Sequence, residues 1–196
     1  MLRRLCVIIL GLLFCLFFGW YIVSADRAPN KTTQTGPLFG FSQDAIAAFQ
    51  VNQFTQGLYF MNTTKGWRVK RVVNDLGKRL KAEQKGPWLE KEGDYLRADP
   101  IKISTALTHL MTLANLTVVS QGATKPSLFE INDYSLHVIL YGIDKGELGR
   151  IFVGKQGPDN DTCFIKTSAS DNIYLAPVNL RPLLMRSLEN WSETSN

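Results

Sequence analysis

Residues 58–72 read LYFMNTTKGWRVKRV, and this stretch predicts a β-hairpin. Its first arm, Leu58–Met61, is apolar and is followed by a polar turn that contains a glycine. In the second arm, WRVKRV, apolar and basic residues alternate, which is the period of a half-buried strand. An antiparallel sheet is therefore expected around this hairpin.

Further strand and helix patterns flank the hairpin. Residues 46–51 read as a strand, with a helix capped by Ser42 as the alternative. After the hairpin, apolar stretches separated by turns rich in Gly, Asp and Asn predict strands over 116–120, 135–141, 148–153, 162–167 and 172–176.

Three helices are expected among these strands. The clearest covers 100–114, because Asp99 is a good N-cap and Pro100 takes the first helical position. A short basic helix is predicted over 75–85, and a closing helix over about 180–191 with Asn179 as its cap. Together these patterns predict an α+β domain with a mostly antiparallel sheet and two main amphipathic helices, preceded by one N-terminal transmembrane helix.

The transmembrane helix is predicted from Leu5–Val23, which contains 19 consecutive uncharged residues. A helix of this length spans about 28 Å, close to one hydrocarbon core. Arg3 and Arg4 precede it, so the positive-inside rule places the N-terminus in the cytoplasm and the rest of the chain beyond the membrane. The alternative is a signal peptide cleaved before Asp26, and both interpretations export the domain.

Beyond the anchor of residues 1–25, we expect a polar linker over 26–43 and an extracytoplasmic domain over 44–193. Cys163 is then the only exported cysteine, so an intrachain disulfide is excluded. It lies in an apolar strand pattern, and we expect it to be a small buried hydrophobic residue.

The net charge of +5 divides unequally along the chain. The first 25 residues carry only Arg3 and Arg4, and the other 171 carry 20 basic and all 17 acidic residues. This balance is not that of a nucleic-acid-binding protein. One segment is locally basic, and it forms the candidate interaction surface for anionic lipid headgroups or an acidic partner. Its cations are Lys65, Arg68, Lys70, Arg71, Lys78, Arg79, Lys81 and Lys85. The alternative is a solvated face whose aliphatic stems lie on apolar surface.

The sequence contains no phosphate-binding glycine loop, no nucleophile elbow and no paired zinc-binding cysteines. His109 is expected on the solvated face of its helix, and His137 as an exposed or hydrogen-bonded strand residue. Asp159-Asn160-Asp161 fits a hairpin turn better than a calcium loop. We predict no catalytic, metal-binding or cofactor-binding residues. An enzyme that uses His137, Cys163 or a carboxylate is the less favoured alternative.

The order of these features is similar to that of a known family. Trp88 lies ten residues before Ala98-Asp99, which opens a helix. A strand that ends in glycine follows at 151–154, then strands at 163–166 and 173–175 and a closing helix with Leu183, Leu184 and Leu188; Phe129-Glu130 replaces the Gly-Leu of the family. From about residue 46 to 192 the chain resembles the bacterial domain of unknown function 4340 family. The resemblance implies an envelope protein, associated in some members with ABC-type export or gliding machinery, and no established activity.

These observations predict a single-pass protein of the bacterial inner membrane with a periplasmic domain. We expect a membrane-anchored interaction module, an accessory component of an ABC-type export or envelope assembly. Its partners would be the membrane, through Leu5–Val23, and a membrane or envelope protein, with no nucleic acid. The alternative is a module that binds anionic lipid or an envelope polymer.

Overall fold

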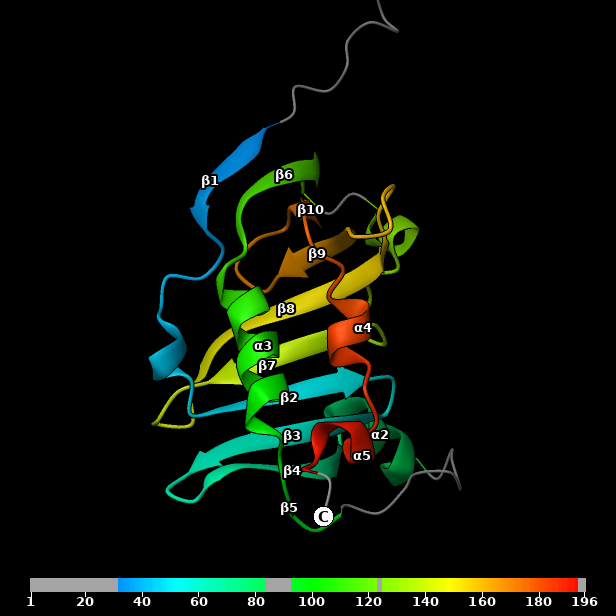
Figure 1. Cartoon of the computed structure of the whole chain (residues 1–196). Coiled ribbons are helices and arrows are strands. Elements are labelled where there is room, and N and C mark those ends of the chain that lie inside the picture. The colour runs from blue at the N-terminus through cyan, green and yellow to red at the C-terminus, as the bar shows by residue number, and fades with distance from the viewer. Residues whose placement is uncertain (1–31, 84–92, 123–124, 194–196) are drawn as a thin grey trace, which may run out of the picture. The chain divides into compact units, whose positions relative to one another are not determined.

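The computed structural model describes residues 32–83, 93–122 and 125–193 (Figure 1). The predicted anchor Leu5–Val23 lies outside the described residues. Within them, no helix is both long and apolar enough to cross a membrane.

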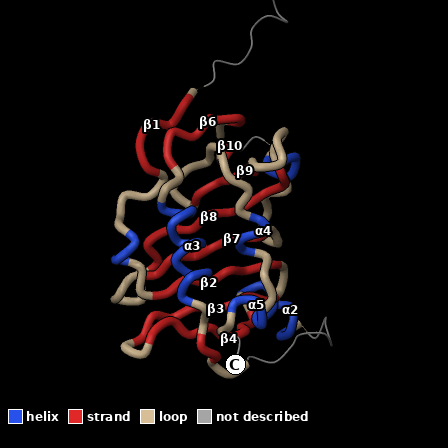
Figure 2. Tube along the Cα trace, viewed as in Figure 1, coloured by secondary structure: helices blue, strands red, loops and turns tan. Residues whose placement is uncertain are grey.

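Strands dominate the fold (Figure 2), and they pair into one antiparallel sheet. In the described part of the chain it has ten strands in the order β1-β6-β10-β9-β8-β7-β2-β3-β4-β5. The strands are β1 (Thr33–Pro37), β2 (Ala48–Gln53), β3 (Gln56–Thr63), β4 (Gly66–Val73), β5 (Leu96–Arg97), β6 (Ala114–Ser120), β7 (Leu136–Tyr141), β8 (Glu147–Gln156), β9 (Cys163–Thr167) and β10 (Ile173–Ala176). The predicted hairpin of residues 58–72 is β3–β4, in which Phe60 pairs with Val69. The α+β class with a mostly antiparallel sheet is therefore confirmed.

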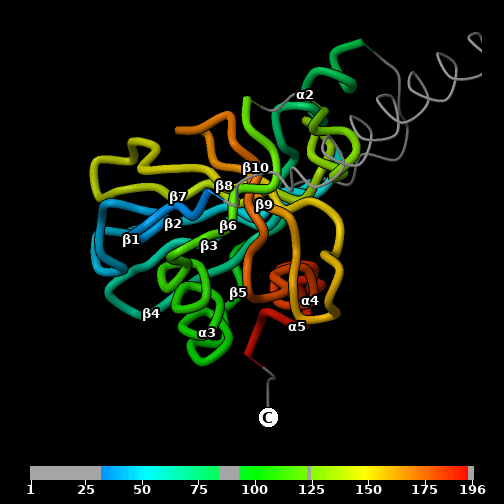
Figure 3. The backbone as a smooth tube through the Cα atoms, turned by 90° about the horizontal axis from the view of Figure 1, so that it is seen from above, coloured from blue at the N-terminus to red at the C-terminus, as the bar shows by residue number. Residues whose placement is uncertain are grey.

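The helices lie on the two faces of the sheet. Figure 3 shows α2 (Asp75–Ala82) on one side of the strands, and α3 (Pro100–Met111), α4 (Arg181–Leu184) and α5 (Leu188–Trp191) on the other. Two short 3-10 helices, η1 (Gln43–Ala45) and η2 (Pro126–Phe129), lie in connecting segments. The N-cap of α3 is Asp99, as predicted: its Oδ1 accepts hydrogen bonds from Ile101 N at 2.9 Å and Lys102 N at 3.2 Å.

The prediction of one continuous closing helix over 180–191 is wrong. The chain leaves the helical conformation at Met185, and α5 starts anew from Ser187, which has extended φ/ψ of −66° and 164° and caps Asn190 N through its side chain. The break carries Trp191 into the core, where its ring lies 5.0 Å from that of Phe60. The second long helix of the fold is accordingly α2 and not the closing segment.

The predicted linker over 26–43 is wrong from Thr33 onward. Residues 33–37 form β1, which pairs with β6 through Thr33–Thr117 and Gln34–Leu116. An edge strand takes its main-chain hydrogen bonds from one neighbour and can be polar on both faces, so β1 carries no apolar period. The prediction of a strand over 46–51 is confirmed by β2. Of the alternative helix after Ser42, only the single 3-10 turn η1 is present.

The hydrophobic core lies between the sheet and α3, α4 and α5. Its largest fully buried side chains include Phe49, Phe60, Ile103, Leu110, Leu140, Ile151, Ile165 and Trp191. Phe49 and Phe60 stack with ring centroids 4.3 Å apart. Cys163 is buried as predicted, its Sγ donates a hydrogen bond to Val178 O at 3.3 Å, and burial raises the pKa of its thiol.

Candidate functional site

The two faces of the sheet differ in composition because successive strand residues point in opposite directions. In β2, Phe49 and Val51 belong to the core beneath the helices, so we name this side the helix face. Gln50 and Asn52 point to the opposite side, the polar face. Asn52 pairs there with Gly57 of β3 and His137 of β7, and His137 pairs with Phe152 of β8.

On the polar face, a cavity of about 440 Å³ lies between the central strands and α2. We name it the polar pocket. Gln50, Asn52, Val72, Val73, Asn74, Asp75, Leu76, Lys78, Arg79, Asp133, His137, Ile139, Tyr141, Arg150 and Phe152 line it. Five polar residues are buried in the described part of the chain, and three of them, Asn52, Asn74 and His137, line this pocket. Because buried polar groups are costly unless they are hydrogen bonded, their concentration here marks the candidate site.

The floor of the pocket is a chain of hydrogen bonds across β2 and β7. Gln50 Nε2 donates to Asn52 Oδ1 at 2.6 Å, and Asn52 Nδ2 lies 3.1 Å from His137 Nε2. His137 Nδ1 lies 3.0 Å from Ser135 O. A carbonyl oxygen can only accept, so we assign the proton of the neutral ring to Nδ1 and the accepting role to Nε2. Both ring nitrogens are therefore engaged within the protein.

Electrostatics agree with this neutral assignment. Burial lowers the pKa of His137 below its usual 6.5, and the positive charge of Arg150 acts in the same direction. A hydrogen bond to Ser135 and the charges of Asp133 and Asp75 oppose the shift without reversing it. The imidazole is thus uncharged at neutral pH.

Gly57 gives Asn52 the space that it needs. A Cβ at position 57 would overlap Asn52 Oδ1 and would lie 2.8 Å from Val51 O. The carboxamide that links Gln50 to His137 therefore occupies the volume that a side chain on β3 would take. This close approach explains a glycine inside a strand, where it otherwise weakens the sheet.

Asn74 joins α2 to the turn between β2 and β3. Its Oδ1 accepts from Gly77 N at 2.9 Å as the N-cap of α2, and its Nδ2 donates to Phe54 O at 2.6 Å. Phe54 has a left-handed φ of 52°, which is uncommon for a bulky residue. Its ring lies 5.9 Å from that of Tyr134, and both side chains are about half exposed.

Two of the cations in the walls of the polar pocket are paired with carboxylates. Arg150 Nη2 lies 2.7 Å from Glu147 Oε2, and Lys78 Nζ lies 3.5 Å from Asp75 Oδ1. Tyr141 and Phe152 add aromatic surface, and burial raises the pKa of the Tyr141 hydroxyl. The pocket therefore combines hydrogen-bond donors and acceptors with apolar rings.

The structure divides the predicted basic surface among several places. Lys65 lies in the β3–β4 turn at one end of β4, and α2 begins after the other end. The eight residues of β4 span about 26 Å, so Lys65 is far from the cations of α2. Arg68 and Lys70 alternate with Arg71, so they point to the polar face while Arg71 points to the helix face. Lys78 and Arg79 line the polar pocket, Lys81 lies on α2 outside that lining, and Lys85 is outside the described residues.

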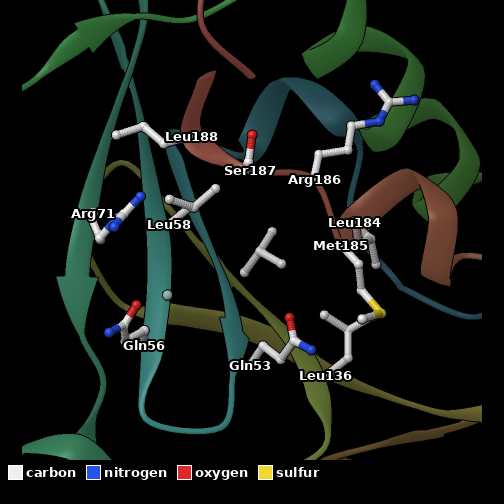
Figure 4. Close-up of a pocket in the computed structure, with 12 residues that line it drawn as sticks. Gln53, Gln56, Leu58, Arg71, Leu136, Leu184, Met185, Arg186, Ser187 and Leu188 are labelled. Carbon is white, nitrogen blue, oxygen red and sulfur yellow. The ribbon is translucent and has the colours of Figure 1, made fainter. Parts of the chain in front are cut away.

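Arg71 contributes to a second cavity, on the helix face. This cavity of about 350 Å³ lies between β2, β3 and the break between α4 and α5 (Figure 4). Leu58, Leu136 and Leu184 supply apolar walls, and Gln53, Gln56, Arg71 and Ser187 supply polar groups. Figure 4 shows the guanidinium of Arg186 turned away from the cavity, and it lies 5.4 Å from the Trp191 ring centroid.

The remaining sequence candidates do not assemble into a reaction centre. Asp159 lies in the loop between β8 and β9, where its carbonyl accepts from Thr162 N at 3.0 Å, as a turn requires. His109 lies on α3, away from the polar pocket lining. Across residues 32–83, 93–122 and 125–193, no group of three His, Cys, Asp or Glu side chains is placed to hold a metal ion.

Asn52, Gly57 and Asn74 were not anticipated from the sequence. The sequence of β2, AFQVNQ, contains a signal for Asn52, because the amides of Gln50 and Asn52 alternate with apolar residues. Gly57, the second residue of β3, is another signal, because glycine is uncommon inside a strand. Both require knowing that β2 pairs with β7, which no local pattern shows.

Comparison with known proteins identifies a family for the chain. No curated protein and no solved structure matches the chain. The family model described as Domain of unknown function (DUF4340) matches residues 88–195, more than half of the chain. The match includes the pocket residues of β7 and β8 but begins after β2, β3 and α2. The chain therefore belongs to the DUF4340 family, as its order of strands and helices indicated.

Proposed function

We propose that this protein is a membrane-anchored extracytoplasmic binding module, an accessory component of an ABC-type export or envelope assembly. The uncharged segment Leu5–Val23 anchors it in the bacterial inner membrane, with the N-terminus in the cytoplasm and the domain in the periplasm. The resemblance that implied an envelope setting is supported by membership of the DUF4340 family.

The polar pocket is the observation that favours binding over catalysis. Its buried amides and imidazole bond to one another, and both nitrogens of His137 are occupied. A general base needs a nitrogen within reach of a substrate proton. A preorganised set of polar groups in a concave, partly apolar site is what recognition of a ligand or partner needs.

Arg68, Lys70, Lys78 and Arg79 lie on the polar-face side, but contacts within the domain argue against their use as a lipid-binding surface. Arg71 points to the helix face, Lys70 lies 5.1 Å from the Tyr95 ring centroid, and Lys78 pairs with Asp75. Anionic headgroups attract cations that face the bilayer together. An interaction module with a defined pocket accounts better for this arrangement.

Topology tests the anchor. A C-terminal alkaline phosphatase fusion should be active in intact cells, and the same fusion without residues 1–25 should be inactive. The mature full chain should keep its unprocessed mobility. An inactive full-length fusion would overturn the proposed location.

Photocrosslinking in intact cells tests the partner. A benzoylphenylalanine in place of Tyr134, which is 53% exposed and follows the pocket residue Asp133 in the chain, should give a defined adduct with a membrane or envelope protein. The matched control is Ile143, 83% exposed in the β7–β8 turn, which should give none. Equal adducts at both positions, or none at Tyr134, would contradict the proposal.

A further inference from the structure

We propose that the polar pocket binds an uncharged saccharide unit, such as one residue of an envelope polysaccharide. This inference rests on the proposed function, because it needs the domain to face the envelope. It specifies the chemical class of ligand that the pocket would take.

The pocket presents donors and acceptors side by side, as a polyhydroxyl ligand requires. Each sugar hydroxyl can donate one hydrogen bond and accept two. Asp75 and Asp133 in the lining supply carboxylate acceptors, and Arg79 and Arg150 supply guanidinium donors. Hydrogen bonds between neutral hydroxyls and charged side chains are among the stronger ones.

Two of the three Lys and Arg side chains in the lining, Lys78 and Arg150, are already paired with carboxylates, which favours an uncharged ligand over an anion. Arg150 makes two hydrogen bonds to Glu147, at 3.2 and 2.7 Å, and Lys78 pairs with Asp75. An anion would have to compete with these carboxylates or lie beside them. A neutral ligand can form hydrogen bonds to the remaining donor and acceptor positions of these side chains while the Arg150–Glu147 and Lys78–Asp75 pairs stay intact.

Apolar surface is also available for the carbon-bound hydrogens of a sugar ring. Ile139, Tyr141 and Phe152 line the same cavity, and Phe152 lies 5.5 Å from the His137 ring. The volume of about 440 Å³ falls within the range of small-ligand sites.

The floor beneath is already ordered. Gly57 leaves room for Asn52, which holds Gln50 and His137 in one hydrogen-bonded chain. The amide of Gln50 is therefore held in place before a ligand arrives. Such preorganisation lowers the entropy that binding must overcome.

The test is calorimetric titration of the full chain in phosphatidylcholine nanodiscs, because glycoside detergents would compete for the pocket. The probes are chitotriose and maltotriose, and inorganic phosphate is the anionic comparison. We expect at least one trisaccharide to bind with a millimolar or lower Kd, little changed by salt, and phosphate not to displace it.

Matched variants locate the binding. Arg79→Ala and Asp133→Asn change exposed lining residues and should each weaken binding about tenfold. Lys81→Ala on the same helix and Asp161→Asn in the β8–β9 loop lie outside the lining and should bind as the wild type does. Circular dichroism melts check that all four variants are folded.

Three results would overturn the inference. The first is that neither trisaccharide binds at about 10 mM, a concentration at which a site of millimolar Kd is nearly full. The others are equal losses of sugar affinity in the lining and control variants, or displacement of bound sugar by phosphate. If the topology and crosslinking results hold and no sugar binds, the binding module stands and only the saccharide assignment fails. If sugar binds and the fusion is inactive in intact cells, the location fails instead.

Discussion

The helix face and the polar face use alternate residues of the same strands. In β2, Phe49 stacks on Phe60 beneath the helices, whereas Asn52, three residues later, bonds to His137 on the opposite side. The first contact is apolar and tolerates small displacements, and the second depends on the direction of each donor and acceptor. The helix face thus supplies stability, and the polar face supplies a fixed arrangement of polar groups.

The largest expected effect is on the helix face. Phe60→Ala removes a fully buried ring that contacts Phe49 and Trp191, and should lower the free energy of unfolding by about 3–5 kcal/mol. Phe54→Ala removes the same side chain from a half-exposed position and should cost less than about 1 kcal/mol. Urea unfolding followed by circular dichroism measures both. Equal losses of unfolding free energy in the two variants would contradict the burial of Phe60 in the core.

Gly57→Ala probes the polar face. The added methyl group would displace the Asn52 carboxamide, and we expect a loss of about 1–3 kcal/mol in unfolding free energy. Gly40→Ala is the matched control, because a Cβ there meets nothing within 4 Å. The control should be neutral or slightly stabilising. A Gly57→Ala protein as stable as the control would refute the close approach of Asn52.

Asn74 allows its two roles to be separated. Asn74→Ala loses the cap of α2 and the hydrogen bond to Phe54 O, and should cost about 1–2 kcal/mol. Asn74→Asp keeps the accepting oxygen but loses the amide donor, so hydrogen exchange should increase at the β2–β3 turn more than in α2. The same increase in both segments would contradict this division.

The smallest effect is a pH dependence. The pKa of His137 is lower in the folded protein than the usual 6.5, so below that pH the unfolded chain takes up the proton first. The free energy of unfolding should therefore decrease as pH falls below 6.5. In His137→Gln this decrease should be shallower, measured by urea unfolding between pH 7 and 5. An unchanged slope would show that the imidazole is not buried in its neutral form.

Local patterns predicted the elements whose residues carry the signal themselves. Asp99 and Pro100 marked the start of α3, and the alternation after Trp67 marked β4. The strand β1 was missed because its stability comes from pairing with β6. The break between α4 and α5 was missed because Leu184 and Leu188 keep a helical spacing across it.

The candidate site was harder to predict than the fold. The basic segment is continuous in sequence, but a strand divides it between two faces, as Lys70 and Arg71 show. The polar pocket is built instead from Asn52, Asn74 and His137, which lie on separate elements. Their proximity depends on strand order, which one sequence does not display.

The pairing of β2 with β7 has a consequence for folding. Asn52 and His137 are 85 residues apart in the chain, yet they meet at the centre of the sheet. The hairpins β2–β3–β4 and β7–β8–β9 can form locally, whereas joining them closes a long loop and is slow. The floor of the polar pocket lies across this junction. A molecule whose pocket is intact has therefore completed this long-range pairing, so ligand binding at this position would report only on molecules in which β2 and β7 have joined.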